Sequence, residues 1–158
     1  MAPLISTIEI ARPPQEVFAF AADPRHFAEW QRDVVSVRVL DAARFTTTRR
    51  IGGTERTMTQ RITRNDPPSY WAAQGVDGPI RPAATISVEP INGGAGSRVT
   101  FTLDIDGHGL GVPIVPLVRR QAQKSAPASH QKLKELLEGR HGRPVPPANA
   151  GRDGTAEG

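Results

Sequence analysis

The stretch RPPQEVFAFAADPRHFAEW, residues 12–30, gathers aromatic side chains and then interrupts them with an Asp-Pro pair. The chain has five phenylalanines, two tryptophans and one tyrosine, and four of these residues lie here, namely Phe18, Phe20, Phe27 and Trp30. The apolar residues before the Asp-Pro pair recur at helical spacing, and Pro14 suits a first turn because its missing N–H has no helical partner there. We therefore expect a short helix that begins at Pro14 and ends before Asp23.

The Asp-Pro pair predicts the start of a second helix. Asp23 can accept a hydrogen bond from the backbone N–H of Arg25 or His26, and Pro24 then occupies the first helical position. This second helix covers about residues 24–30 and places its two aromatic residues on one side. Two short helices joined at an angle can wrap around a curved surface, which one long helix cannot do.

Alternating apolar and polar residues predict strands on both sides of the two helices. We expect strands over residues 4–10, 34–41, 43–51, 54–63, 69–75, 83–91 and 97–106. The connections between them are short and rich in Gly, Pro, Asn and Asp. Such connections favour an antiparallel meander over parallel strands with helical crossovers.

A long helix is predicted over about residues 115–138, with Gly139 as the residue that ends it. Pro127 lies inside this helix, where it removes one hydrogen bond and crowds the carbonyl of Gln123, so we expect a kink. The alternative is that residues 115–125 are irregular and that the helix begins near Pro127. The pattern thus predicts an α+β protein that ends in a helix.

Length and composition place these elements in one domain. A chain of 158 residues can bury a core, and we assign residues 1–138 to the domain and residues 139–158, which have few apolar side chains, to a disordered tail. The chain has no cysteine, which excludes disulfides and thiol nucleophiles. The formal net charge is +4, but the arginines are scattered rather than clustered, so we expect no nucleic-acid partner.

Other classes of protein and site are also not indicated. No stretch approaches about 18 consecutive apolar residues, so we expect no membrane span. The N-terminus lacks the basic segment of a signal peptide, which favours a cytoplasmic protein. The four histidines lack the spacing of zinc ligands, and the glycine runs precede strands rather than helices, so we expect no metal and no cofactor. Nothing in the sequence indicates an oligomeric state.

Short motifs in a fixed order carry a resemblance to a known family. They are Ile8-Glu9-Ile10 before Pro13, Glu16-Val17-Phe18, Asp23-Pro24 followed by Trp30, the Pro67-Pro68 turn, Gly96-Ser97-Arg98-Val99, Leu133-Lys134 and Leu137-Glu138. With these motifs the chain resembles, over residues 4–138, the START-like helix-grip superfamily (SRPBCC), and most of all its polyketide cyclase/dehydrase and lipid-transport group. The resemblance implies a seven-stranded curved antiparallel sheet around the long C-terminal helix. It also implies an apolar cavity between them, with the two short helices at the open side.

The resemblance implies a ligand class, an apolar or aromatic metabolite such as a polyketide or a lipid-like compound. Our leading hypothesis is a protein that binds such a molecule. A second hypothesis is a polyketide cyclase or dehydratase, which would need His26, Tyr70 or Arg49 aimed into the cavity. A third is a protein-interaction module without a natural ligand, whose cavity would be filled by its own side chains.

Strand alternation and helix spacing identify the side chains expected to line this cavity. They are Trp30, Phe45, Arg49, Met58, Gln60, Trp71, Ile86, Phe101, Leu103, Ala122 and Ala126. Arg49 and Gln60 are polar, so each requires a protein partner, a ligand oxygen or a position at a rim open to water. Ala122 and Ala126 lie in the middle of the helix face toward the sheet, where small side chains leave space that Leu or Phe would fill.

Overall fold

The computed structural model describes residues 2–141. The strands are β1 (Leu4–Ile10), β2 (Val34–Val39), β3 (Arg44–Ile51), β4 (Thr54–Asp66), β5 (Tyr70–Gly75), β6 (Ile80–Ile91) and β7 (Gly96–Gly107). The helix α1 (Pro14–Ala21), the 3-10 turn η1 (Pro24–His26) and the helix α2 (Phe27–Trp30) follow β1. After the strands, η2 (Asn92–Gly94) joins β6 to β7, and η3 (Gly109–Ile114) leads into the long helix α3 (Val115–His141).

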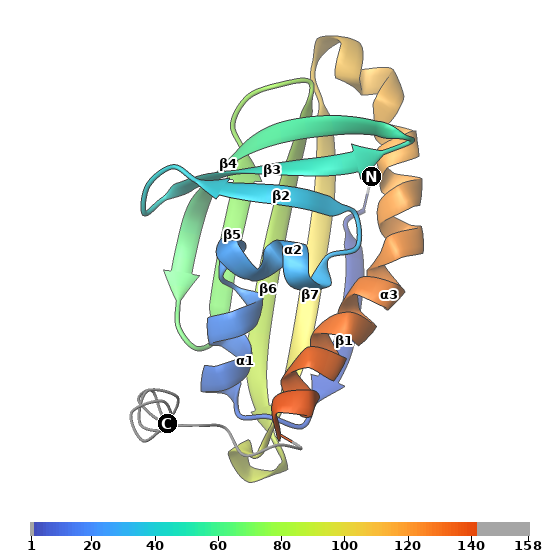
Figure 1. The fold of residues 1–158 in the computed structure, drawn as a ribbon. Coiled ribbons are helices and arrows are strands. Elements are labelled where there is room, and N and C mark those ends of the chain that lie inside the picture. Colours follow the sequence, from blue (N-terminus) through green and yellow to red (C-terminus); the bar gives the residue numbers. More distant parts are fainter. Residues whose placement is uncertain (1, 142–158) are drawn as a thin grey trace, which may run out of the picture.

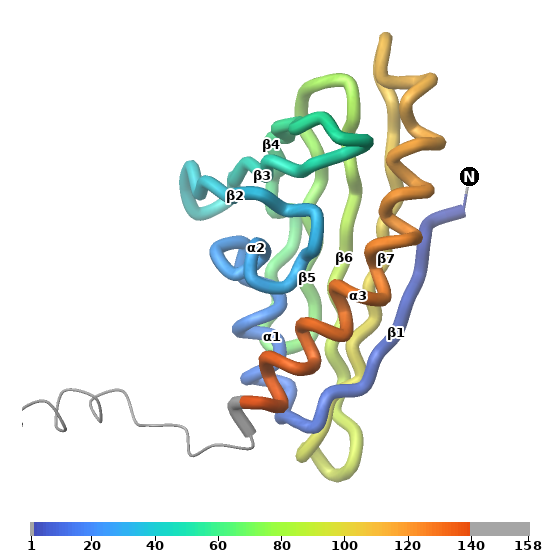
Figure 2. The backbone as a smooth tube through the Cα atoms, turned by 45° about the vertical axis from the view of Figure 1, so that its right-hand side comes forward, coloured from blue at the N-terminus to red at the C-terminus, as the bar shows by residue number. Residues whose placement is uncertain are grey.

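The strands form one antiparallel seven-stranded sheet in the order β1-β7-β6-β5-β4-β3-β2. Strands β2 to β7 are a meander, and β1 pairs with β7 so that Ile8 lies opposite Val99. Figure 1 shows β2, β3 and β4 running across the upper part of the molecule, while β1 and β5 to β7 run along its length. The sheet therefore curls, and α3 crosses its concave side (Figure 2). This confirms the predicted helix-grip α+β fold.

The two short helices form as the Asp-Pro pair predicts. Asp23 Oδ1 accepts the backbone N–H of Arg25 at 3.0 Å, and Pro24 occupies the first position of η1. The second helical segment is a 3-10 turn followed by the single turn of α2, rather than a uniform helix. By contrast, α1 has no side-chain cap at Pro13, so its stability depends on the aromatic and aliphatic side chains that it buries.

Two strand boundaries lie three residues from their predicted positions, and the others lie within two residues of theirs. β4 continues to Asp66 and carries a bulge between Ile62 and Arg64, which bends the strand. β6 begins at Ile80 rather than at residue 83, so Pro82 lies inside a strand. Pro82 pairs with Ile105 of β7 and lies one position beyond the last residue pair between β5 and β6, so no pairing with β5 requires its missing N–H.

The helix α3 is continuous through Pro127, which confirms the first of the two alternatives. Figure 2 shows that its axis changes direction near the middle, in agreement with the expected kink. The prediction that Gly139 ends the helix is wrong, because α3 continues to His141. One exposed glycine costs a helix only about 1 kcal/mol, which the preceding turns offset. The rest of the predicted tail, residues 142–158, lies outside the described residues.

The core consists of two apolar clusters. The first joins α1 and α2 to the sheet and to the end of α3, through Val17, Phe27, Trp71 and Leu133 among others. The second lies toward the start of α3 and consists of Ile51, Met58, Ile80, Ile105, Val115 and Val118. Residues of both clusters line the same internal space, so the cavity lies between them.

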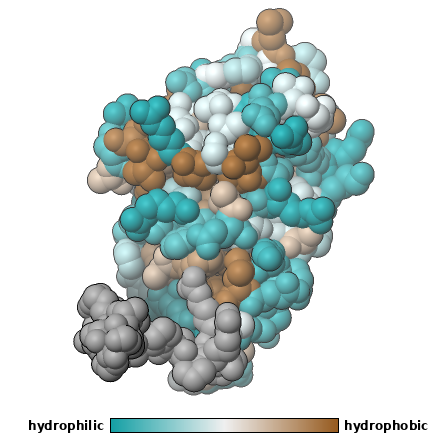
Figure 3. All heavy atoms as spheres, viewed as in Figure 1, coloured by the Kyte–Doolittle hydropathy of each residue, from teal (hydrophilic) through white to brown (hydrophobic). Residues whose placement is uncertain are grey.

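A band of hydrophobic residues crosses the face on which β2 lies (Figure 3). Val35, Val39 and Leu40, in β2 and the turn after it, are exposed there, and none of them lines the internal cavity. Within the described part of the chain, no helix is long and apolar enough to cross a membrane.

Candidate functional site: the cavity under α3

A cavity of about 170 Å³ lies between the concave face of the sheet and α3. Strands β3 to β7 form one wall, α3 forms the opposite wall, and α2 closes one end. Of the side chains predicted from the sequence, the following line it: Trp30, Arg49, Met58, Gln60, Trp71, Ile86, Phe101, Leu103, Ala122 and Ala126. Strand parity and helix spacing thus bring these residues together around one space.

Phe45 is the exception among the predicted side chains. It faces inward but lies outside the cavity wall, with its ring 5.8 Å from that of Phe27 and 6.1 Å from that of Trp71. Trp71 lines the cavity under α3 and contacts Phe45, and both rings also line a second hollow on the side of α1. Phe45 therefore packs against Trp71, which lines the cavity, and does not line the cavity itself.

Aromatic rings form the end of the cavity near α2. Phe27 stands edge-to-face with both Trp30 and Trp71, at centroid distances of 6.1 Å and 5.7 Å. Trp30 also lies 5.7 Å from Phe101. The indole nitrogens of both tryptophans are fully enclosed and have no hydrogen-bond partner among residues 2–141. This end of the site is therefore formed by packed aromatic rings, and the protein covers both indole N–H groups.

Gln60 brings a polar group to the sheet wall. Its side chain is 5% exposed, which excludes the alternative of a position open to water. The hydroxyl of Thr47, which is also buried, donates to Gln60 Oε1 at 3.0 Å. The amide nitrogen has no hydrogen-bond partner within residues 2–141 and is not fully enclosed, so the N–H₂ group is free to donate to water or to a ligand.

Arg49 lies at the edge of the cavity and is held by the protein. Its Nη1 donates to Asp33 Oδ1 at 2.9 Å, and its Nη2 donates to Gln31 Oε1 at 2.6 Å. Asp33 neutralises the guanidinium charge, and Gln121 of α3 reaches the other oxygen of the same carboxylate. Arg49 therefore connects the loop before β2 to β3. Its positive charge is already neutralised by the protein and is not available to an anionic ligand.

His130 lines the cavity from α3, and the sequence reasoning did not select it. The Nδ1 atom lies 3.1 Å from Ser6 Oγ of β1, and the imidazole stacks on Phe101 with 4.0 Å between ring centroids. Burial lowers the pKa of His130 to about 4, because water no longer stabilises the charged form. The imidazole is thus neutral at pH 7. Its position follows Ala122 and Ala126 at four-residue steps, so helix spacing was a signal that could have found it.

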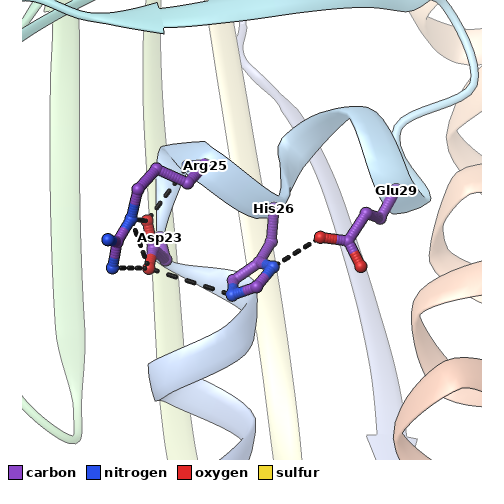
Figure 4. Close-up of polar contacts among 4 residues, drawn as sticks. All are labelled: Asp23, Arg25, His26 and Glu29. Carbon is purple, nitrogen blue, oxygen red and sulfur yellow. Dashed lines mark hydrogen bonds and ion pairs between the residues drawn. The ribbon is translucent and has the colours of Figure 1, made fainter.

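The other two side chains considered for catalysis lie outside the cavity. His26 stacks on Phe20, and its ring nitrogens face Glu29 and Asp23, as Figure 4 shows. Tyr70 is half-buried under the guanidinium of Arg64, 4.5 Å from its ring centroid. His26 therefore stabilises the turn after α1, and Tyr70 packs on the outer face of the sheet. In the described chain, no group of three or more His, Asp or Glu side chains could hold a metal ion.

Comparisons with known proteins agree with this architecture. Among solved structures, the ZhuI aromatase/cyclase from Streptomyces sp. R1128 has a TM-score of 0.78 at 13% identity, over 91% of this chain and 97% of that chain. A START superfamily protein from Mycobacterium smegmatis has a TM-score of 0.71 at 13% identity, over 86% and 97%. The di-domain aromatase/cyclase BexL has a TM-score of 0.68 at 19% identity, over 87% of this chain and 47% of that chain.

Likeness at such low identity shows the fold alone, and no curated protein matches the chain in sequence. The family model for polyketide cyclase/dehydrase and lipid transport, however, matches residues 1–138, which include every strand and nearly all of α3. The chain therefore belongs to the polyketide cyclase/dehydrase and lipid-transport family.

Proposed function

We propose that the protein binds a small apolar or aromatic metabolite in the cavity under α3. The observation that carries this proposal is the unfilled space itself. Close packing is the rule in protein interiors, yet about 170 Å³ is left open between the sheet and the helix. An apolar cavity of about 150 Å³ can hold benzene, so the space suits a molecule built on one ring.

The side chains of α3 explain why the space is open. The part of α3 that lines the cavity carries the small side chains of Ala122, Ser125, Ala126 and Ser129, with Gln121 and His130 beside them. The residues that anchor the two ends of this face, Val118 and Leu133, are larger and buried. A helix that served only to fill the core would carry large residues in the middle as well, which favours ligand binding over a protein-interaction module with a filled interior.

A second candidate function is the cyclisation or dehydration of a polyketide held in the same cavity. Two of the similar structures are aromatase/cyclases, and His130 brings a titratable side chain to the wall. The side chains first considered for this chemistry do not support it, because His26 and Tyr70 lie outside the cavity and Arg49 is bound to Asp33 and Gln31. Binding alone requires only the shape of the cavity, so it remains the leading proposal.

Filling the cavity from the helix tests the proposal. We expect the parent protein to bind toluene, measured by isothermal titration calorimetry, and Ala126→Phe to abolish that binding with little loss of stability, because the new ring occupies empty space. Gln123→Phe, at an exposed position of the same helix, is the matched control and should bind toluene as the parent does.

A packed interior would give the opposite result. Ala126→Phe and Ala122→Phe would then each destabilise the protein by about 1–3 kcal/mol through overpacking. If both substitutions do so and the parent binds no toluene, the cavity is not a binding site.

A further inference from the structure

Most polar side chains in the cavity wall are already bonded to the protein. Thr85 and Thr102 bond to each other, Ser125 donates to the carbonyl of Gln121, and the hydroxyl of Ser129 accepts the N–H of Arg32. Arg49, Asp33 and Gln31 form the group described above. Within residues 2–141, Trp30, Trp71, Gln31, Gln60 and His130 of the wall each keep one side-chain nitrogen without a hydrogen-bond partner. The two indole nitrogens are fully enclosed and Gln31 is only half-buried, which leaves His130 and Gln60 as the buried side chains whose free nitrogen is not fully enclosed.

We propose that the cavity selects ligands that carry a hydroxyl or carbonyl oxygen on an apolar ring, and that His130 is the residue that recognises this oxygen. The inference rests on the proposed function and adds to it the chemistry of the ligand. Gln60, on the opposite wall, supplies a second polar contact.

The fold fixes how His130 presents its ring. Ser6 on β1 engages Nδ1, and Phe101 on β7 stacks on the ring with only 12° between the two planes. This leaves Nε2 as the nitrogen available to a ligand. Among residues 2–141, the partnerless nitrogens that are fully enclosed belong to Trp30, Arg56, Trp71 and Arg119, so Nε2 of His130 is not fully enclosed, and His130 is one of the residues that line the cavity.

The chemistry of the ligand follows from what these groups can donate and accept. If the Ser6 hydroxyl donates to Nδ1, then Nε2 carries the proton and donates to a ligand carbonyl or hydroxyl oxygen. If Nδ1–H donates to Ser6, then Nε2 accepts from a ligand hydroxyl. The amide N–H₂ of Gln60 is a donor in either case, and it too needs an oxygen. A buried polar group without a partner is costly, so a purely apolar ligand leaves both groups unsatisfied.

The volume limits the rest of the ligand. About 170 Å³ suits one six-membered ring with a short substituent, and the wall around that ring is made of Trp30, Phe101, Ile86 and Leu103. The expected class is therefore a monocyclic phenol, aryl ketone or alicyclic compound of similar size.

Two pairs of probes with matched shapes test the inference. Phenol and toluene differ in a hydroxyl against a methyl group, and acetophenone and α-methylstyrene differ in a carbonyl against a methylene group. Kd values are measured by calorimetry for the parent and for His130→Phe, which keeps a ring on Phe101. For each pair we compare the ratio of the two affinities between the parent and the variant. The two probes differ in hydration, but this difference is the same for both proteins and cancels in the comparison.

We expect His130→Phe to lower the phenol/toluene ratio, the acetophenone/α-methylstyrene ratio or both by about tenfold, as the loss of one buried hydrogen bond predicts. The pair that responds identifies the direction of the Nε2 bond. His108→Phe is the matched control, because His108 is exposed and lies outside the cavity, and it should leave both ratios unchanged.

Ratios that are equal in the parent and in His130→Phe overturn the inference but leave the proposed function standing as long as toluene binds. A parent protein that binds none of the four probes overturns both. If His130→Phe does not fold, 15N-labelled histidine in the parent provides the test. Phenol or acetophenone must then move the Nε2 resonance of His130 more than the Nδ1 resonance, and resonances that do not move reject the role of His130.

Discussion

The side chain of His130 holds a proton less tightly than an ordinary histidine because the protein encloses it. Its pKa is lowered from 6.5 to about 4, and the cause is burial. The side chains that contact the ring, those of Ser6, Phe101 and Trp30, carry no charge that could offset this effect. Charging His130 in the folded protein is therefore unfavourable.

This difference predicts how stability depends on pH. Between pH 6.5 and pH 4 the unfolded chain binds a proton at His130 and the folded protein does not, so the free energy of unfolding falls as the pH falls through this range. The loss from this group levels off below about pH 4, after reaching at most about 3 kcal/mol. Urea denaturation at several pH values measures it.

His130→Phe removes this contribution. The free energy of unfolding of the parent, taken relative to that of the variant, should therefore fall as the pH is lowered. All groups other than residue 130 are common to both proteins, so their contributions cancel in the comparison. A difference that stays constant from pH 7 to pH 4 would contradict a buried neutral imidazole.

Individual residues also show what the sequence can and cannot predict about the site. Parity placed Met58 and Gln60 on the inner face because the period of a strand is fixed at two residues. The same rule misplaced Phe45, because parity gives the face and not the depth at which a side chain lies in a curled sheet. The partner of Arg49 is Asp33, which lies in a loop. The periodicity of a sequence does not predict the path of a loop, so this ion pair could not be foreseen. His130 was overlooked because a single histidine has no motif.

At the level of elements, the connection between α1 and α2 depends on one cap. Asp23→Ala removes the oxygen that accepts the N–H of Arg25, and we expect it to destabilise the protein by about 1 kcal/mol. Asp23→Asn keeps an equivalent acceptor and should cost much less. The ion pair with Arg25 is exposed on the Arg25 side and adds little.

Chemical denaturation of the parent and the two variants decides the point. Equal midpoints for Asp23→Ala and the parent would mean that the cap adds no stability. Equal losses for the alanine and asparagine variants would assign the effect to the charge of Asp23 rather than to the cap.

Element boundaries were harder to predict than element types. The predicted strand began at residue 83, whereas β6 begins at Ile80 and includes Pro82, which lies one position beyond the last residue pair with β5. Gly139 suggested a helix end, yet nothing in the last turn of α3 requires a left-handed residue. The kink at Pro127 was predictable, since its cause is local to the chain.

For the molecule as a whole, the sequence predicts that residues after the last leucines of α3 add nothing to the core. Leu133 and Leu137 are both fully buried and anchor the end of α3. We expect a chain that ends at His141 to have the same Tm as the full chain, measured by calorimetry. A chain that ends at Lys132 loses both leucines and should be destabilised by several kcal/mol or fail to fold, at about 2–5 kcal/mol for each buried side chain. A drop of several degrees on removing residues 142–158 alone would contradict the prediction.

The pairing of β1 with β7 has a consequence for how the protein is made. Thr7 and Thr100 face each other across this ladder although they are 93 positions apart in the chain, whereas every other pairing joins strands that are consecutive in the sequence. On the ribosome, β1 is synthesised before the other strands, and its partner β7 is synthesised last, so the two cannot pair until almost the whole sheet has been translated. Closing so long a loop costs entropy that only the finished ladder offsets. Phe27 can meet Phe45 of β3 and Trp71 of β5 earlier, but the contact between Trp30 and Phe101 can form only after β7, the last strand, has been made.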